Sequence, residues 1–225
     1  MSKLRCHITI SLDGYVAGPN QSEQNPLGEG GEQLHDWIAP LAAFRETHGE
    51  QGGQGGEVNA STPIVEESRQ NIGAAVMGRN MFGPIGGGAW GEEQWTGWWG
   101  ANPPYHYPVF ILTHHPRDPV EMEGGTTFHF VTNGIESALE QAKKAASGKD
   151  VMLWGGGNIA QQYLAAGLLD ELELHVVPVL LGGGARLLDH LGDAEVRLEQ
   201  VRAVEAPGVT HLKYRILPGA PSRSR

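Results

Sequence analysis

The stretch that decides the fold is VMLWGGGNIAQQYLAAG, residues 151–167. Residues 151–154 form a short apolar run, which is typical of a buried strand. From Asn158 onward the apolar side chains recur at helical intervals, and Gly167 is placed to end the helix. The sequence therefore predicts a strand that runs into a helix through three glycines.

These glycines predict an anion site. The first N–H groups of a helix have no partner within it, and the helix dipole adds partial positive charge there. Without a Cβ atom in the way, an anion can approach the backbone closely. The pattern Gly155-x-Gly157-x-x-Ala160 fits the dinucleotide-binding fingerprint, so a phosphate or pyrophosphate is the expected guest. A tight strand–helix turn without a ligand is the alternative interpretation.

Charge and composition argue against several classes of partner. The chain has 225 residues and a formal net charge of −10, which disfavours nucleic acid and anionic membranes. Cys6 is the only cysteine, so no internal disulfide can form, and we expect a cytoplasmic protein. No apolar run is long enough to span a bilayer, and the first ten residues lack a signal-peptide core. We therefore expect a small-molecule substrate, with any anionic ligand held by local donors.

The rest of the chain alternates predicted strands and helices, which indicates an α/β fold. We expect strands at 4–12, 74–77, 109–112, 126–131 and 171–177, helices at 34–46, 62–73 and 135–146, and an antiparallel hairpin of 196–204 with 209–217. The sheet should be mostly parallel and flanked by helices, with antiparallel strands at its C-terminal edge. We predict one domain over 1–217 with a flexible Gly/Gln insertion at 47–60, followed by a disordered tail at 218–225.

Acidic residues near two predicted elements are candidate functional groups. Asp13 lies in SLDGYVAG, residues 11–18, directly after the first strand, where sites are often built. Plain turn chemistry is the alternative for this segment. Asp36, which precedes Trp37 in the predicted helix 34–46, is either a first-turn acid that complements the helix dipole or an acid that faces a pocket.

Other candidates follow the next strands. Arg79 comes just after a strand and Gly78, where it can hold a phosphate bidentately, although a solvated surface arginine is the alternative. The pair His114-His115 suggests a metal, but no third ligand lies nearby at ligand spacing, so we expect none. The Trp-rich loop 83–108 either covers an aromatic ligand, makes a subunit contact or simply anchors itself by hydrophobic packing.

Taken together, the motifs resemble the dihydrofolate-reductase-like superfamily, and most closely the reductase domain of the riboflavin-biosynthesis deaminase-reductase. They occur in the family's order and span nearly the whole chain: SLDGYVAG at 11–18, VMGRNMF at 76–82, VFILTHHPR at 109–117, VMLWGGGNIAQQYL at 151–164 and DELELHVVPVLLGGG at 170–184. The resemblance implies a three-layer dihydrofolate-reductase-like fold, a homodimer, NADPH as cofactor and hydride transfer to a C=N or C=O bond. The substrate would be a small heterocycle or sugar-like molecule, similar to 5-amino-6-(5-phosphoribosylamino)uracil.

The resemblance also implies roles for particular residues. Cofactor binding falls to the glycine motif, with Gly155, Gly156, Gly157, Asn158, Ile159 and Ala160, and to Gly78, Arg79, Asn80, Thr113 and His114. Of these, Arg79 and Thr113 match the positions that hold the adenosine 2′-phosphate. Substrate binding falls to Ser11, Asp13, Ala17 and Trp37, and the proton would come from Asp13, Asp36 or water.

One departure from the family pattern keeps the substrate open. Riboflavin reductases carry a stretch like GxxTVxxDDPxLxxR, which helps to bind the ribosyl phosphate, where this chain has GRNMFGPIGGG. A dihydrofolate or pterin reductase is therefore an alternative, with Asp36 in the place of the carboxylate that holds the pterin. A nucleotide-binding module without turnover is another, since fold does not fix function.

Overall fold

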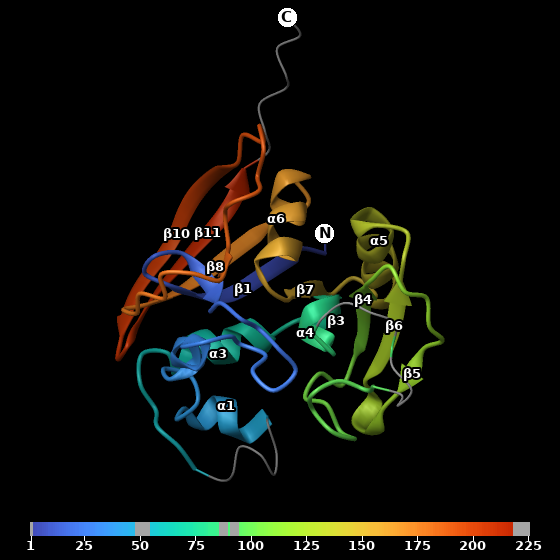
Figure 1. The fold of residues 1–225 in the computed structure, drawn as a ribbon, viewed down its shortest axis with the longest axis horizontal. Coiled ribbons are helices and arrows are strands. Elements are labelled where there is room, and N and C mark those ends of the chain that lie inside the picture. The colour runs from blue at the N-terminus through green and yellow to red at the C-terminus, as the bar shows by residue number, and fades with distance from the viewer. Residues whose placement is uncertain (1, 48–54, 86–89, 91–94, 218–225) are drawn as a thin grey trace, which may run out of the picture.

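The molecule is built on a nine-stranded sheet, shown in Figure 1. The computed structural model describes residues 2–47, 55–85, 90 and 95–217. Across the sheet, the strands are β10 (Arg197–Ala206), β11 (Val209–Leu217), β8 (Glu171–Val177), β1 (Leu4–Ser11), β7 (Asp150–Trp154), β3 (Ile72–Gly78), β4 (Pro108–Leu112), β6 (Thr127–Val131) and β5 (Val120–Glu121).

Strand pairing confirms the predicted mixed sheet. The six strands from β8 to β6 run parallel to one another. β11 is antiparallel to β8, and β10 is antiparallel to β11, so the C-terminal hairpin closes one edge. At the other edge the short strand β5 is antiparallel to β6. Parallel neighbours require crossover connections, most of which contain a helix here, whereas the connection from β4 to β6 contains only β5 and a 3-10 turn.

Helices cover both faces of the sheet and make three layers. Helices α5 (Ile135–Ala145) and α6 (Gly157–Ala165) lie on one face, where their apolar side chains join the main core with alternate residues of β1. Helices α1 (Ala42–Thr47) and α3 (Thr62–Arg69) lie on the other face, over a smaller apolar cluster.

The predicted helix over 34–46 is wrong. The structure has instead a 3-10 turn, η1 (Gly31–His35), then irregular backbone, and then the short helix α1. Pro40 explains the break, because proline lacks the N–H that a helix interior needs and its ring clashes with the preceding turn. The helix predicted at 62–73 begins at Thr62 but ends at Arg69, and Asn71 then adopts a left-handed conformation before β3.

The predicted insertion at 47–60 lies partly outside the described residues. Where the chain is described again, it is attached to the body. Glu57 N–H donates to the Pro40 carbonyl, and Ala42 N–H donates to the Glu57 carbonyl. A Cβ atom on Gly56 would lie 2.6 Å from the Ala42 nitrogen. The predicted tail at 218–225 also lies outside the described residues.

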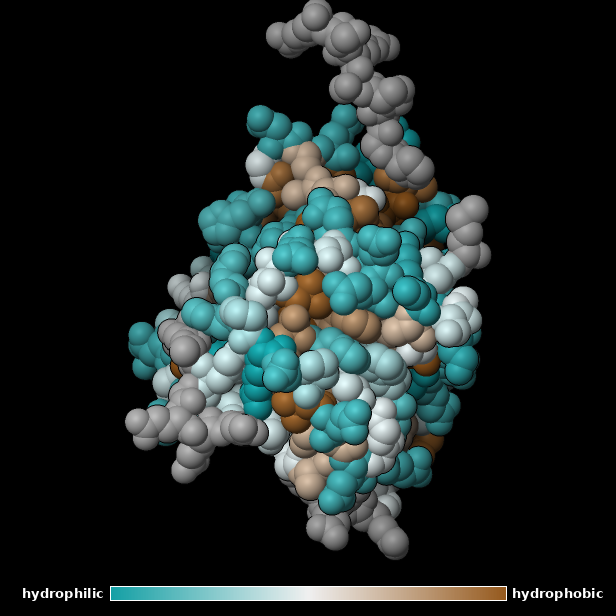
Figure 2. All heavy atoms as spheres, turned by 90° about the vertical axis from the view of Figure 1, so that its right-hand side faces the viewer, coloured by the Kyte–Doolittle hydropathy of each residue, from teal (hydrophilic) through white to brown (hydrophobic). Residues whose placement is uncertain are grey.

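Smaller elements complete the fold. A two-stranded sheet of β2 (Tyr15–Ala17) and β9 (Ala185–Arg186) joins the segment after β1 to the loop after β8. The others are α4 (Arg79–Phe82) and the 3-10 turn η2 (Glu123–Gly125). The face on the β5–β6 side carries hydrophobic side chains in small, separate patches among hydrophilic ones (Figure 2). Within the described part of the chain, no helix is both long and apolar enough to cross a membrane.

Candidate active site

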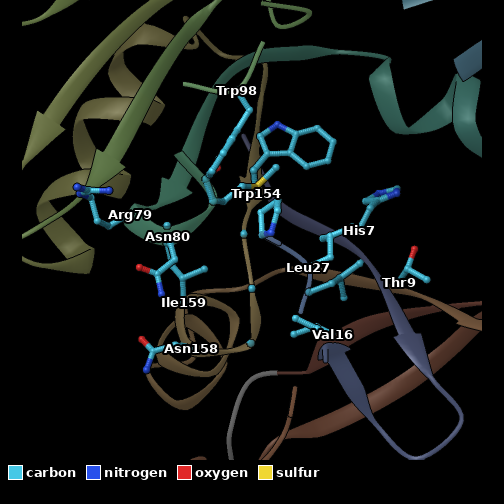
Figure 3. Close-up of a pocket in the computed structure, with 18 of the residues that line it drawn as sticks. His7, Thr9, Val16, Leu27, Arg79, Asn80, Trp98, Trp154, Asn158 and Ile159 are labelled. Carbon is cyan, nitrogen blue, oxygen red and sulfur yellow. The ribbon is translucent and has the colours of Figure 1, made fainter. Parts of the chain in front are cut away.

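One cavity of about 1080 Å³ collects most of the candidate residues. It opens where the parallel strands end, as ligand sites in open α/β sheets do. Figure 3 shows Arg79, Asn80, Asn158 and Ile159 on one side and His7, Thr9, Val16 and Leu27 on the other. We call the first side the glycine end, made by Gly78, Arg79, Asn80, Thr113, His114, Gly155, Gly156, Gly157, Asn158 and Ile159. We call the second the aromatic end, made by His7, Thr9, Trp37, Trp98, Trp99, Tyr105, Tyr107, Trp154 and His175.

The glycine turn connects β7 to α6 as the sequence predicts. A Cβ atom on Gly155 would lie 2.8 Å from the Ile159 side chain, and one on Gly157 would lie 2.3 Å from the Arg186 carbonyl oxygen. Both positions therefore need glycine for packing. Gly156 differs, because a Cβ atom there would meet nothing within 4 Å. Its open side leaves room for a ligand at the start of the helix.

Arg79 lies at the glycine end, and some of its hydrogen-bond donors have no partner among the described residues. Its Nη1 donates to the carbonyls of Gly83 and Pro84. Its Nε and Nη2 are buried and have no hydrogen-bond partner among the described residues. The guanidinium carbon lies 4.1 Å from the centre of the Trp90 ring, and that of Arg117 lies 5.2 Å from the same ring. Two cations thus flank one indole, and burial together with Arg117 lowers the pKa of Arg79.

The other predicted cofactor residues fall into two groups. Thr113 follows β4, which pairs with β3, so it reaches the same sheet edge as Arg79. The Thr113 hydroxyl accepts from the His115 N–H at 3.1 Å. Ala160 does not line the cavity; it is 1% exposed and belongs to the main core, where it packs α6 on the sheet.

Asp13 and Ser11 lie outside the cavity lining and stabilise a turn. The Ser11 hydroxyl donates to Asp13 Oδ1 at 2.6 Å, and the carboxylate also accepts from the backbone N–H groups of Leu181 and Gly182. These hydrogen bonds, that of Ser11 first, lower the pKa of Asp13 to about 2. The structure thus favours the turn interpretation of Asp13, because a carboxylate that stays ionised is a poor proton donor near pH 7.

Asp36 and Trp37, although adjacent in the sequence, lie in different environments. Asp36 is exposed and does not line the cavity. Trp37 is 6% exposed, lines the aromatic end, and donates from its indole N–H to the Thr9 hydroxyl at 3.3 Å. Ala17, the remaining predicted substrate residue, also lines the cavity.

Part of the Trp-rich loop 83–108 lies outside the described residues; its described part packs on the body and contributes to the cavity wall. Trp95 and Trp98 donate from their indole nitrogens to backbone carbonyls of α4. Tyr107 accepts from the Trp154 indole N–H at 3.3 Å, and burial raises the pKa of Tyr107 to about 12. Hydrophobic anchoring and a place beside a ligand are thus compatible interpretations of this loop.

Sequence reasoning missed a set of polar side chains behind the aromatic end. β8 pairs with β1 on one side and with β11 on the other, and their polar residues share one face of the sheet. Helix α3 covers this face, because Arg5 donates to the carbonyls of Glu67 and Gln70. We call it the polar face, formed by Arg5, His7, Thr9, Glu171, Glu173, His175, His211 and Lys213.

Three histidines of the polar face are buried and neutral. His175 Nδ1 lies 2.8 Å from His211 Nδ1, and His211 Nε2 lies 2.9 Å from the Ser61 hydroxyl. His7 Nδ1 lies 3.6 Å from Glu173 Oε2. Burial lowers the pKa of His7 to about 3 and that of His211 to about 4, and it holds the pKa of His175 well below its usual range.

No group of three or more potential metal ligands gathers within the part of the chain that the structure describes. The cavity is lined by the glycine turn and an arginine at one end, and by aromatic rings and neutral imidazoles at the other. Such a site can hold a long, partly anionic ligand beside a planar one.

Comparison with known proteins identifies the family. The family model of the RibD C-terminal domain matches residues 2–212. The chain belongs to the RibD C-terminal domain family. The resemblance to this family that the sequence indicates is thus confirmed.

Solved structures show the same dihydrofolate-reductase-like fold as this RibD C-terminal domain. A crystal structure from Shewanella sp. PV-4, of a protein provisionally assigned to riboflavin biosynthesis, has a TM-score of 0.61 at 21% identity and covers 97% of this chain and 100% of that chain. Acinetobacter baumannii RibD gives 0.55 at 16%, covering 97% of this chain and 59% of that chain. Dihydrofolate reductase from Enterococcus faecalis, complexed with NADP(H), gives 0.50 at 13%, covering 95% and 96%.

Among curated proteins, YyaP of Bacillus subtilis (strain 168), itself uncharacterised, is 36% identical over 58 residues. This match covers 26% of the chain and 30% of YyaP.

Proposed function

We propose that this protein is an NADPH-dependent reductase that transfers hydride to a C=N or C=O bond of a small, planar heterocycle. The observation that carries the proposal is that one cavity joins the glycine end, with the open side of Gly156 and the buried nitrogens of Arg79, to the aromatic end. Its volume of about 1080 Å³ suits a cofactor and part of a substrate together. Family membership supports a reductase of the RibD and dihydrofolate reductase type.

The glycine end fits NADPH. Gly156 leaves open space at the start of α6, where a pyrophosphate would meet unpaired backbone N–H groups. Arg79 offers two buried nitrogens without partners, which a 2′-phosphate would satisfy. When bound, the nicotinamide supplies the hydride, and the protein supplies binding and orientation.

The aromatic end fits a flat substrate with polar edges. Trp37, Tyr105 and Trp154 offer ring faces, and Thr9 and His175 offer polar atoms beside them. A pyrimidine of riboflavin biosynthesis has this shape, and the similarity to RibD supports that class. The alternative of a pterin reductase loses its expected carboxylate, because Asp36 points outside the cavity lining.

A matched pair of variants at one glycine tests the cofactor site. Gly156→Asp places a negative charge in the open space, and Gly156→Ala adds only a methyl group that meets nothing. We expect Gly156→Asp to raise the Kd for NADPH by about 10-fold to 100-fold, which corresponds to the loss of one charge-assisted hydrogen bond. Gly156→Ala should change it little. Fluorescence titration measures both values, and circular dichroism checks that both variants are folded.

Two results would count against the proposal. Equal NADPH affinity in both folded variants would refute the cofactor site. NADPH binding without oxidation, across a panel of pyrimidines, pterins and sugar-like carbonyl compounds, would favour a nucleotide-binding module over an enzyme.

A further inference from the structure

We propose that His175 is a catalytic residue that donates a hydrogen bond from Nε2 to the substrate atom at which negative charge develops, with His211 and Ser61 fixing the tautomer that makes this possible. This inference rests on the proposed reductase function. It assigns the electrophilic role at the aromatic end, which neither Asp13 nor Asp36 is placed to fill.

His175 lies at the boundary between the polar face and the cavity. It is 7% exposed, lines the cavity, and its ring centre is 4.9 Å from that of Trp37. In the strand register it lies beside Thr9 of β1, which also lines the cavity. Its Nδ1 is engaged by His211, while its Nε2 has no hydrogen-bond partner within the described chain.

The protonation pattern begins at Ser61. This residue is 0% exposed, and its hydroxyl has a single hydrogen-bond partner among the described residues, His211 Nε2 at 2.9 Å. If the hydroxyl accepted from His211, its own buried hydrogen would have no acceptor, which is unfavourable. The hydroxyl therefore donates, and His211 Nε2 accepts.

The remaining protons follow from this one. A neutral His211 that accepts at Nε2 carries its hydrogen on Nδ1. It donates that hydrogen to His175 Nδ1 at 2.8 Å, so a neutral His175 carries its hydrogen on Nε2. Both rings are neutral near pH 7, because burial lowers the pKa of each, and His7 and Arg202 lower that of His175 further.

A neutral imidazole N–H facing the cavity is suited to an acceptor. Hydride addition to a C=O or C=N bond builds negative charge on the oxygen or nitrogen, and a fixed donor stabilises that charge. His175 keeps its own hydrogen in this role. The reduced cofactor would give the hydride to the carbon, and water would supply the proton that the oxygen or nitrogen then takes up. The arrangement favours substrates that present a carbonyl oxygen or an unprotonated ring nitrogen over those that present only donors.

Substitutions along the chain of three residues test the role. His175→Phe keeps a ring but removes the donor, and we expect kcat/KM to fall by about 10²-fold to 10³-fold with the Kd for NADPH unchanged. Ser61→Ala removes the hydroxyl without removing a helix cap, because the Ser61 side chain caps no N–H of α3. It should lower kcat/KM less, by about tenfold. His190→Phe, at an exposed histidine outside the cavity lining, is the control and should leave activity unchanged.

A second readout does not depend on turnover. Nitrogen-15 NMR of the imidazoles distinguishes the two neutral tautomers, and we expect His175 to carry its hydrogen on Nε2 in the wild-type protein and to become a mixture in Ser61→Ala. A wild-type His175 with its hydrogen on Nδ1 would overturn the inference, as would His175→Phe with kcat/KM within threefold of wild type. If the wild type turns over none of the substrates tested, the proposed function fails, and the NMR result alone decides the tautomer.

Discussion

The two ends of the cavity hold polar groups in opposite ways. At the glycine end, the donors are backbone N–H groups of a turn and an arginine that follows a strand. At the aromatic end, they are side chains of the polar face, presented by three neighbouring strands and covered by α3. The first construction uses short local motifs. The second brings together residues far apart in the sequence, such as Ser61 and His211, which are 150 positions apart and hydrogen-bonded to each other. One half of the cavity, the glycine end, thus depends on local sequence motifs, and we call it the local half. The other half, the aromatic end with the polar face behind it, depends on residues distant in the sequence, and we call it the global half.

The global half should be the more costly one to disturb. Glu173 is 1% exposed, and its Oε1 accepts from Arg202 Nη2 at 2.8 Å. Its other oxygen, Oε2, is buried 3.6 Å from His7 Nδ1, beyond hydrogen-bond distance. Removing one partner of a buried ion pair costs more than the pair itself contributes. Here the cost is moderated, because Arg202 is 29% exposed and also pairs with Glu67.

The largest expected effect therefore comes from Glu173→Ala. We expect it to lower the free energy of unfolding by about 3 kcal/mol, the low end for a broken buried ion pair, because Arg202 keeps Glu67 as a partner. The matched control is Glu199→Ala, because Glu199 pairs with Arg215 at the same distance of 2.8 Å but with both side chains more than half exposed. That change should cost about 0–1 kcal/mol. Urea unfolding of both variants measures the difference. Similar losses would show that an ion pair in the polar face contributes no more to stability than an exposed one.

Acid should weaken the polar face before it affects the carboxylates. The pKa of His7 is about 3 and that of His211 about 4 in the folded state, whereas an unperturbed histidine titrates near 6.5. Between those values the unfolded chain binds more protons, so stability is full above about pH 6.5 and falls as the pH drops. The loss is at most about 1.4 kcal/mol per pH unit for each histidine.

Unfolding curves at pH 8, 7, 6 and 5 test this expectation. The values at pH 8 and pH 7 should agree, and the value at pH 5 should be clearly lower. Glu67 and Glu171 have pKa values lowered below the usual 4.5, so their contributions are lost only in more acidic solution. Equal stability at pH 7 and pH 5 would mean that the histidines take up protons in the folded protein as readily as in the unfolded chain.

The same difference between the local half and the global half explains which features could be predicted from the sequence and which could not. The glycine turn, the parallel strands and the C-terminal hairpin are predicted correctly because each depends on a local pattern. In β8, Glu171, Glu173 and His175 alternate with apolar residues, which is typical of a strand with one solvent-exposed face. The structure instead covers that face, and no local pattern shows what lies above a strand.

A signal for the polar face does exist in the sequence, but only across strands. Basic or imidazole side chains alternate in β1 and in β11, and acidic ones alternate in β8, which pairs between them. If these three strands are taken as neighbours, their complementary charges favour a buried network over a solvated face. Pro40 is also a local signal that the predicted helix 34–46 breaks. In the structure, Asp36 is exposed, whereas Trp37 lines the cavity.

The smallest expected effect concerns the glycine end, where Arg79→Ala should weaken NADPH selectively. A hydrogen bond to a charged group contributes about 1.5–3 kcal/mol, so the Kd for NADPH should rise by about one to two decades. The Kd for NADH should change little, because NADH lacks the 2′-phosphate. Titration of both cofactors against both proteins gives the four constants.

Whether Arg79 recognises the 2′-phosphate is decided by the ratio of the affinity lost for NADPH to the affinity lost for NADH, and not by the loss for NADPH alone. Arg79 also donates to the carbonyls of Gly83 and Pro84, and it stacks on Trp90. Its removal thus has a structural component, which weakens both cofactors alike. Only the excess loss for NADPH reports the two nitrogens, Nε and Nη2, that lack partners among the described residues. If NADPH and NADH lose equal affinity, Arg79 holds the loop and does not recognise the phosphate. Any anion affinity of the glycine end would then come from the backbone of the turn. Any preference for NADPH would have to come from another cation, and Arg117, beside the same indole, would be the first to test.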